Sequence, residues 1–101
     1  MAPISEDGLS KLVDEKVSGN VVMVFSKSYC PFGARVESLF KSNKIPYDLM
    51  YLDEMETGPA IQDVLLQKTG QKTVPNVFVG GNHIGNILEA LFLNTFLSIN
   101  F

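Results

Sequence analysis

An uninterrupted apolar run at residues 21–25 constrains the fold more than any other stretch of this sequence. The run lacks polar alternation, so it predicts a strand over residues 21–26 that is covered on both faces. Apolar residues then recur from Phe32 to Phe40 at i, i+4, i+7 and i+8, which is typical of an amphipathic helix. A second strand is expected at 47–52. A strand–helix–strand order predicts two parallel strands joined by a right-handed crossover.

The only cysteine, Cys30, lies in the turn between that first strand and the helix. Pro31 suits the first helical position, because its missing N–H would have no intrahelical partner there. Cys30 is therefore expected beside free backbone N–H groups and the positive end of the helix dipole. That environment favours the thiolate, which is the reactive form of cysteine. A buried, inert thiol is the common alternative for a lone cysteine, but the neighbouring Lys27 and Pro31 favour a reactive one.

Periodicity and turn residues predict the other elements. The remaining helices and strands are expected at residues 5–18, from 57–59 to Gly70, at 76–79, at 82–84 and at 86–101. Gly80-Gly81 joins the two short strands, which is a hairpin signal. The segment 86–101 is apolar, but polar residues interrupt it too often for a membrane span. A terminal helix packed on the sheet is expected there instead.

Length, charge and cysteine content narrow the class of protein. With 101 residues, the chain is expected to form one domain with a modest core. The net charge is −3 without a block of like charge, so neither nucleic acid nor an anionic membrane is an expected partner. The first residues do not have the pattern of a signal peptide. A single cysteine excludes an intrachain disulfide framework and favours a reducing compartment, so we expect a cytoplasmic monomer.

Two strings of residues resemble a glutaredoxin of the thioredoxin-like fold. They are Val24-Phe25-Ser26-Lys27-Ser28-Tyr29-Cys30-Pro31-Phe32 and Gly70-Gln71-Lys72-Thr73-Val74-Pro75-Asn76-Val77-Phe78. The resemblance covers nearly the whole chain up to Gly85. It implies one glutaredoxin-like domain over 1–101, an α/β fold with a central four-stranded mixed sheet flanked by helices. It also implies an oxidoreductase in which Cys30 attacks disulfides and carries a mixed disulfide with glutathione.

The same resemblance implies a glutathione site around the thiol. Lys27 would support the thiolate and bind the glycyl carboxylate of glutathione, and Gln62 and Lys72 would contact the same end of the tripeptide. The backbone of Val74, next to a cis Pro75, would pair with the cysteinyl moiety as in strand addition. Further contacts are implied for Tyr29, Thr73, Leu88 and Glu89. Judged without the resemblance, these polar residues could also be solvated surface side chains, and Tyr29 a packing aromatic.

Two departures from the family pattern concern the chemistry. Gly33 stands where most such proteins have a second cysteine, so no intramolecular disulfide can form. A monothiol route remains, in which a second glutathione regenerates Cys30 by thiol exchange. The turn from Gly85 to Glu89 would hold the γ-glutamyl carboxylate at a helix N-terminus, and here Asn86 replaces a glycine. We expect this turn to weaken glutathione affinity, and we expect Gly33 and the turn together to weaken activity.

Three functions stay open at this point. The first is a monothiol, glutathione-dependent oxidoreductase that deglutathionylates mixed disulfides of proteins. The second is a dimer that bridges an iron–sulfur cluster through Cys30 and two glutathiones, although Pro31 stands where cluster-binding relatives have glycine. The third is an impaired variant that acts through protein contacts. No other metal is expected, because His83 lacks a ligand partner at suitable spacing. Arg35 and Glu37 are expected on the solvated face of their helix.

Overall fold

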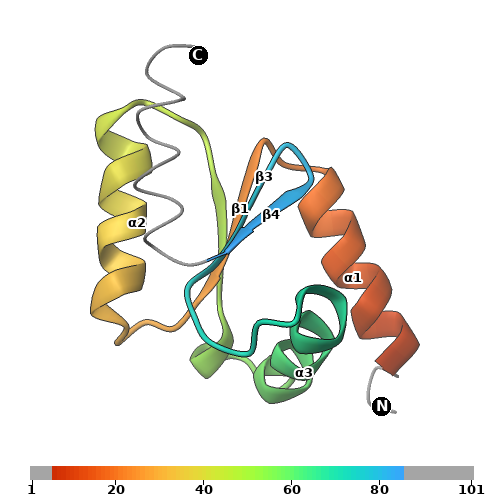
Figure 1. Cartoon of the computed structure of the whole chain (residues 1–101). Coiled ribbons are helices and arrows are strands. Elements are labelled where there is room, and N and C mark those ends of the chain that lie inside the picture. Colours follow the sequence, from red (N-terminus) through yellow and green to blue (C-terminus); the bar gives the residue numbers. More distant parts are fainter. Residues whose placement is uncertain (1–5, 86–101) are drawn as a thin grey trace.

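The computed structural model describes residues 6–85, which form a four-stranded sheet between two layers of helices. The elements are α1 (Glu6–Ser18), β1 (Val22–Ser26), α2 (Pro31–Ser42), β2 (Asp48–Tyr51), the 3₁₀ helix η1 (Leu52–Glu54), α3 (Gly58–Thr69), β3 (Asn76–Val79) and β4 (Asn82–Gly85). The strand order is β2-β1-β3-β4. Helix α2 covers one face of the sheet, and α1 and α3 cover the other (Figure 1).

Strand β1 is the centre of this arrangement. All five of its residues are buried, and successive side chains point to opposite faces. Met23 and Phe25 join the cluster under α1 and α3, whereas Val22 and Val24 join the cluster under α2. The strand pairs in parallel with β2 and antiparallel with β3. The predictions of a doubly covered strand and a parallel crossover are therefore confirmed.

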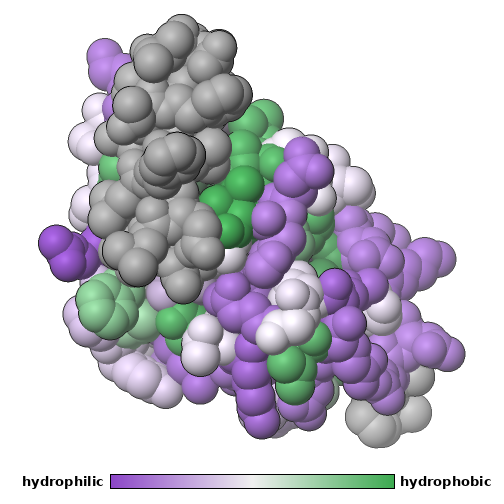
Figure 2. All heavy atoms as spheres, viewed as in Figure 1, coloured by the Kyte–Doolittle hydropathy of each residue, from purple (hydrophilic) through white to green (hydrophobic). Residues whose placement is uncertain are grey.

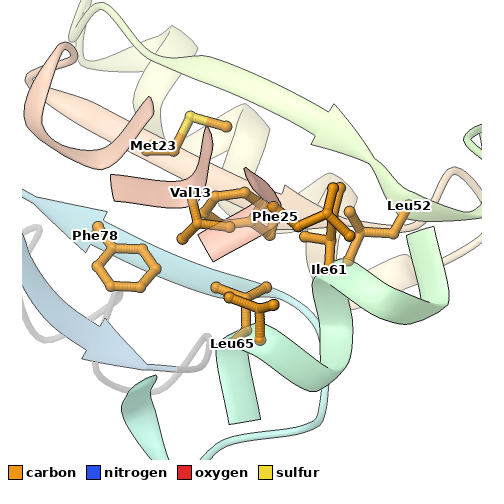
Figure 3. Close-up of a cluster of buried hydrophobic side chains, with 9 residues drawn as sticks. Val13, Met23, Phe25, Leu52, Ile61, Leu65 and Phe78 are labelled. Atoms are coloured by element: carbon orange, nitrogen blue, oxygen red, sulfur yellow. The ribbon is translucent and has the colours of Figure 1, made fainter. Parts of the chain in front are cut away.

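The larger apolar cluster lies between the sheet and the helices α1 and α3 (Figure 3). Its rings, Phe25 and Phe78, meet edge to face with centroids 5.9 Å apart. Leu52 and Ile61 close the end of the cluster from η1 and α3. Full burial of an aliphatic or aromatic side chain of this size contributes about 1.5–3 kcal/mol. This packing gives the loops at the end of β1 a rigid base.

Other expected elements are present with small shifts in their ends. The hairpin turn at Gly80-Gly81 joins β3 to β4, and both glycines have positive φ angles. Strand β2 is shorter than expected, because η1 begins at Leu52 within the predicted strand and continues into the predicted loop. The predicted helix over 86–101 lies outside the described residues. Between residues 6 and 85, no helix is long and apolar enough to cross a membrane.

One core prediction is wrong. Phe32 was expected on the apolar face of its helix, but 52% of its surface is exposed, whereas Val36 and Phe40 are buried. The reason is that Gly33, not Phe32, is the buried residue in the first turn of α2, where it lies against Ser26 of β1. Phe32 precedes Gly33 by one residue and therefore points about 100° away from it around the helix. Elsewhere the helices are amphipathic as expected. Hydrophilic side chains dominate the visible surface over α1 and α3, and apolar surface appears in smaller patches (Figure 2).

Candidate functional site

Cys30 is the N-cap residue of α2, at the carboxyl end of β1. Its N–H donates to the carbonyl of Lys27 at 3.0 Å, which closes a tight turn. Its Sγ accepts from the N–H of Gly33 at 3.4 Å, and Pro31 occupies the first turn of the helix. The sulfur thus serves as the acceptor that a helix N-terminus requires. The side chain is half-buried, so the thiol has both a stabilising donor and access to solvent.

The turn that carries Cys30 is held by a carboxylate that follows the neighbouring strand β2. Asp53, in η1, accepts from the backbone N–H of Ser28 at 2.8 Å and also from the Ser28 hydroxyl. The Ser28 hydroxyl first, then its N–H, and more weakly the charge of Lys27 hold the pKa of Asp53 below its ordinary value of 3.8. No motif in the sequence singles out Asp53 as part of the site. Asp53 could have been found from its position after a strand parallel to β1. The segments that follow parallel strands lie together at the carboxyl ends of those strands.

A second loop, residues 72–75, faces the thiol from the other side. The carbonyl oxygen of Val74 lies 3.8 Å from the Sγ of Cys30. The Val74–Pro75 peptide bond is cis, as the resemblance implied, and Pro75 is buried. Cys30 is therefore placed between the start of α2 and the backbone of Val74.

Two glutamine side chains hold this loop by its carbonyl groups. Gln62, in α3, donates to the carbonyl of Lys72 at 2.6 Å. Gln71 donates from one Nε2 atom to the carbonyls of Thr73 at 2.9 Å and Pro75 at 3.0 Å. The family resemblance implies a glutathione contact for Gln62. Gln71 belongs to the second string that carries the resemblance, but no role is implied for it. Gln71 binds carbonyls two and four residues further along the chain. Hydrophobic periodicity does not predict hydrogen bonds of this kind.

Lys27 and Gln62, which were predicted to contact glutathione, line the same hollow, with a volume of about 230 Å³. Asp53 and Glu56 contribute carboxylates to its wall. The hollow therefore combines one cationic side chain, an amide and two acidic groups. Lys27 and Asp53 belong to the turn that carries Cys30 or contact it, so this hollow adjoins the turn and could receive part of a small polar molecule.

The structure brings together only part of the predicted set. Cys30 meets Val74 directly, and Gln62 meets the backbone of Lys72. The side chain of Tyr29 is 71% exposed beside the thiol, so its interpretation as a packing aromatic is wrong. Lys72 and Thr73 are exposed at the surface of the loop. Leu88 and Glu89 lie outside the described residues.

The position of the absent second cysteine is filled by a neighbouring hydroxyl. A Cβ atom on Gly33 would lie 2.1 Å from the Oγ of Ser26, at the end of β1. Ser26 is completely buried, and within residues 6–85 its hydroxyl has no hydrogen-bond partner. Any side chain at position 33 thus requires Ser26 to turn away. Gly33 is a packing feature of this chain as well as the loss of a thiol.

Of the two residues expected on the solvated face of their helix, Arg35 is exposed as predicted. His83 is also exposed. Within residues 6–85, no three His, Cys, Asp or Glu side chains are grouped so that they could hold a metal. Glu37, the other residue expected on the solvated face, is instead half-buried and accepts a hydrogen bond from the hydroxyl of Tyr51 at 2.8 Å. This bond to a carboxylate, followed by burial, raises the pKa of Tyr51 to about 12.

A cysteine at a helix N-terminus facing a cis-proline loop, on a sheet of order β2-β1-β3-β4, is the arrangement of a thioredoxin-like protein. A sequence profile of the glutaredoxin family matches residues 22–84. Glutaredoxin-C6 of Oryza sativa subsp. japonica is 45% identical over 80 residues, which are 79% of this chain and 71% of that protein. The chain belongs to the glutaredoxin family.

Other comparisons agree on family and fold. Monothiol glutaredoxin-S12, chloroplastic, of Arabidopsis thaliana is 42% identical over 87 residues, which are 85% of this chain and 49% of that protein. A mutated buckwheat glutaredoxin superposes with a TM-score of 0.88 at 37% identity, covering 93% of this chain and 86% of that one. A buckwheat glutaredoxin–glutathione complex gives 0.87 at 38% identity with the same coverage. The architecture is therefore the thioredoxin-like glutaredoxin fold.

Proposed function

We propose that this chain is a monothiol, glutathione-dependent oxidoreductase that removes glutathione from mixed disulfides. One observation carries the proposal: Cys30 accepts the N–H of Gly33 at a helix N-terminus and faces the Val74 carbonyl, while the sequence holds no second cysteine. Glutaredoxins generally are oxidoreductases that use glutathione, and a glutaredoxin of closely similar fold was solved as a glutathione complex. The presence of a single cysteine in this chain supports the more specific, single-thiol reaction.

The reaction consists of two thiol–disulfide exchanges. The Cys30 thiolate attacks the glutathione sulfur of a mixed disulfide, forms a Cys30–glutathione disulfide, and releases the substrate as a thiolate that takes up a proton. A second glutathione, as its thiolate, then attacks the glutathione sulfur bound to Cys30. Oxidised glutathione leaves and the Cys30 thiolate is restored. Electrons balance without a metal or another cofactor, and the donor N–H of Gly33 stabilises the thiolate at the start and the end.

The neighbouring side chains would orient glutathione on this thiol. The backbone groups of Val74 would pair with its cysteinyl part, and the cationic Lys27 and Lys72 would attract its glycyl carboxylate. Gln62 uses one N–H on the Lys72 carbonyl, and an amide has two, so one donor remains for the ligand. Tyr29 and Thr73 border the site from the turn and the loop. Leu88 and Glu89 would bind the γ-glutamyl end.

Turnover of a glutathionylated peptide, coupled to the appearance of oxidised glutathione, tests the proposal. The wild-type chain should turn over, and Cys30→Ser should show none. Mass spectrometry after incubation with oxidised glutathione should find one added glutathione, at Cys30. An unmodified Cys30, or turnover that survives Cys30→Ser, would exclude the proposed reaction.

The two other hypotheses have their own readouts. A visible absorbance after anaerobic reconstitution with iron and sulfide, together with a dimer in solution, would favour the cluster-bridging function. Normal folding without any glutathione adduct or heat of binding would favour the impaired variant. The chain has a single cysteine, so Cys30→Ser is the matched control in both experiments.

A further inference from the structure

The amide of Gln71 fixes the loop that faces Cys30. Its Nε2 atom donates to the Thr73 carbonyl at 2.9 Å and to the Pro75 carbonyl at 3.0 Å. We infer that Gln71 is a positioning residue for glutathione, because it holds the Val74 backbone in the orientation that the tripeptide pairs with. The inference rests on the proposed function and adds to it a residue that itself does not touch the ligand.

Within the described part of the chain, no other hydrogen bond fixes the carbonyls of Thr73 and Pro75. Strand β3 begins to pair with β1 at Asn76, and within residues 6–85 the segment 72–75 makes no backbone–backbone hydrogen bond. An amide nitrogen carries two N–H donors, and Gln71 uses both on the residues that precede and follow Val74. With the flanking carbonyls turned toward Gln71, the Val74 carbonyl faces the Sγ of Cys30 at 3.8 Å.

Gln71 is itself anchored to the end of α3. Its backbone N–H donates to the hydroxyl of Thr69 at 3.0 Å, and that hydroxyl donates to the Leu65 carbonyl at 2.7 Å. Leu65 is buried in the main apolar cluster. The Gln71 side chain is half-buried, where its hydrogen bonds compete less with water than they would at the surface. The rigidity of α3 is thus passed through Thr69 and Gln71 to Val74.

This arrangement separates glutathione binding from the reactivity of the thiol. Cys30 receives its stabilising hydrogen bond from Gly33 in α2, and Asp53 holds the turn before it. Neither contact involves Gln71, and the Val74 carbonyl, 3.8 Å from the Sγ, can accept a hydrogen bond only from the protonated thiol, not from the reactive thiolate. Loss of the Gln71 amide should therefore weaken glutathione binding while the thiol remains as reactive as before. A residue with a general structural role would change both properties together.

The experiment compares Gln71→Ala and Gln71→Glu with Gln67→Ala. Gln71→Glu keeps the size but removes both donors, and Gln67 is a control because its amide donates to Glu6 on the exposed faces of α3 and α1. Three quantities are measured: KM and kcat for glutathione in the peptide assay, the rate of Cys30 alkylation by iodoacetamide, and the thermal midpoint. Both Gln71 variants should raise KM by roughly tenfold to a hundredfold, the loss expected for two neutral hydrogen bonds. Alkylation should stay within about twofold of wild type.

The outcomes distinguish the inference from the proposed function. Suppose that the wild type turns over and the KM of the Gln71 variants rises no more than that of Gln67→Ala. This result would contradict the role of Gln71 but would not contradict the proposed function. Alkylation that falls in step with the rise in KM also overturns this role, because Gln71 would then be structural. A wild type without glutathione turnover removes both. If Gln71→Ala fails to fold, Gln71→Glu is read by the same three measurements.

Discussion

Two segments flank the Cys30 sulfur, and side chains of opposite character hold them. The turn Lys27–Cys30 is held by Asp53, an exposed carboxylate that accepts two hydrogen bonds from Ser28. The loop 72–75 is held by Gln71, a half-buried neutral amide that donates two. The first contact depends on the ionisation of the acid, whereas an amide does not titrate. The thiol side of the site should therefore respond to pH and salt, and the carbonyl side should respond to neither.

The largest expected effect comes from removing the sulfur that both segments face. Cys30→Ser should abolish glutathione exchange, because a hydroxyl does not replace a thiolate as nucleophile or leaving group at neutral pH. Stability should be unchanged or slightly higher, since serine is among the preferred N-cap residues. The measurements are peptide turnover and thermal unfolding. If hydrogen exchange shows that either segment has lost protection in this variant, then the sulfur, and not Asp53 or Gln71, is what orders it.

The second-largest effect is expected from the packing of Gly33, in the first turn of α2, against the buried Ser26 at the end of β1. Gly33→Ala should lower the free energy of unfolding by about 1 kcal/mol, because the new Cβ displaces the buried Ser26 hydroxyl. Ser26→Ala should be neutral or stabilising, since it removes a buried hydroxyl that lacks a partner within residues 6–85. The double variant should recover the loss and gain from the higher helix propensity of alanine.

A double-mutant cycle by chemical denaturation measures this coupling. An interaction energy below about 0.5 kcal/mol would mean that Ser26 does not limit what position 33 can hold. A matched cycle with Gln71→Ala in place of Ser26→Ala should show no coupling. Gln71 and Gly33 contact different backbone segments, and distant sites add independently.

The pH dependence of stability tests the difference between the ionisable contact of Asp53 and the neutral contact of Gln71. The pKa of Asp53 is held below 3.8 in the folded chain, so Asp53 contributes stability that is present above pH 3.8 and is lost as pH falls through the lowered value. Asp53→Asn should be less stable than wild type at neutral pH, and the difference should vanish in acid. The deficit of Gln71→Ala should persist over the same range. Equal pH dependence in both variants would contradict the comparison.

The two segments also differ in what the sequence could predict. The position of Cys30 at the start of α2 follows from local signals: an apolar strand, a proline and a periodic helix. The parallel pairing of β1 and β2 follows from the strand–helix–strand order, because a helical crossover joins parallel strands. Asp53 and Ser28 are 25 residues apart in the sequence. They are in contact because β1 and β2 are parallel, so that the segments following the two strands lie at the same end of the sheet. The sequence alone therefore located the thiol but not the carboxylate that holds its turn.

Contacts within the loop 72–75 were no easier to predict, although they are local. Gln71 reaches carbonyls two and four residues away, and that reach depends on the turn geometry at Val74 and Pro75. Hydrophobic periodicity reports which side chains are buried, but it does not report where an amide points. The exposure of Phe32 was missed for a related reason. The apolar spacing includes Phe32, whereas the residue that is buried in the first turn of α2 is Gly33.

The smallest effect is expected from the hydrogen bond between Tyr51 and Glu37, which lies next to the 3₁₀ helix that carries Asp53. Tyr51 ends β2, directly before η1, and its hydrogen bond to Glu37 in α2 raises its pKa to about 12. The bond should contribute stability that is complete below the ordinary value of 10 and is lost as pH rises through about 12. Glu37→Ala should return the Tyr51 pKa toward 10, and an ultraviolet titration of tyrosinate, with Tyr51→Phe as control, should show the shift. Cys30 alkylation should not change, because Asp53 keeps both bonds to Ser28. A change in alkylation would show that α2 and η1 position the thiol jointly, so that the turn is not held by Asp53 alone.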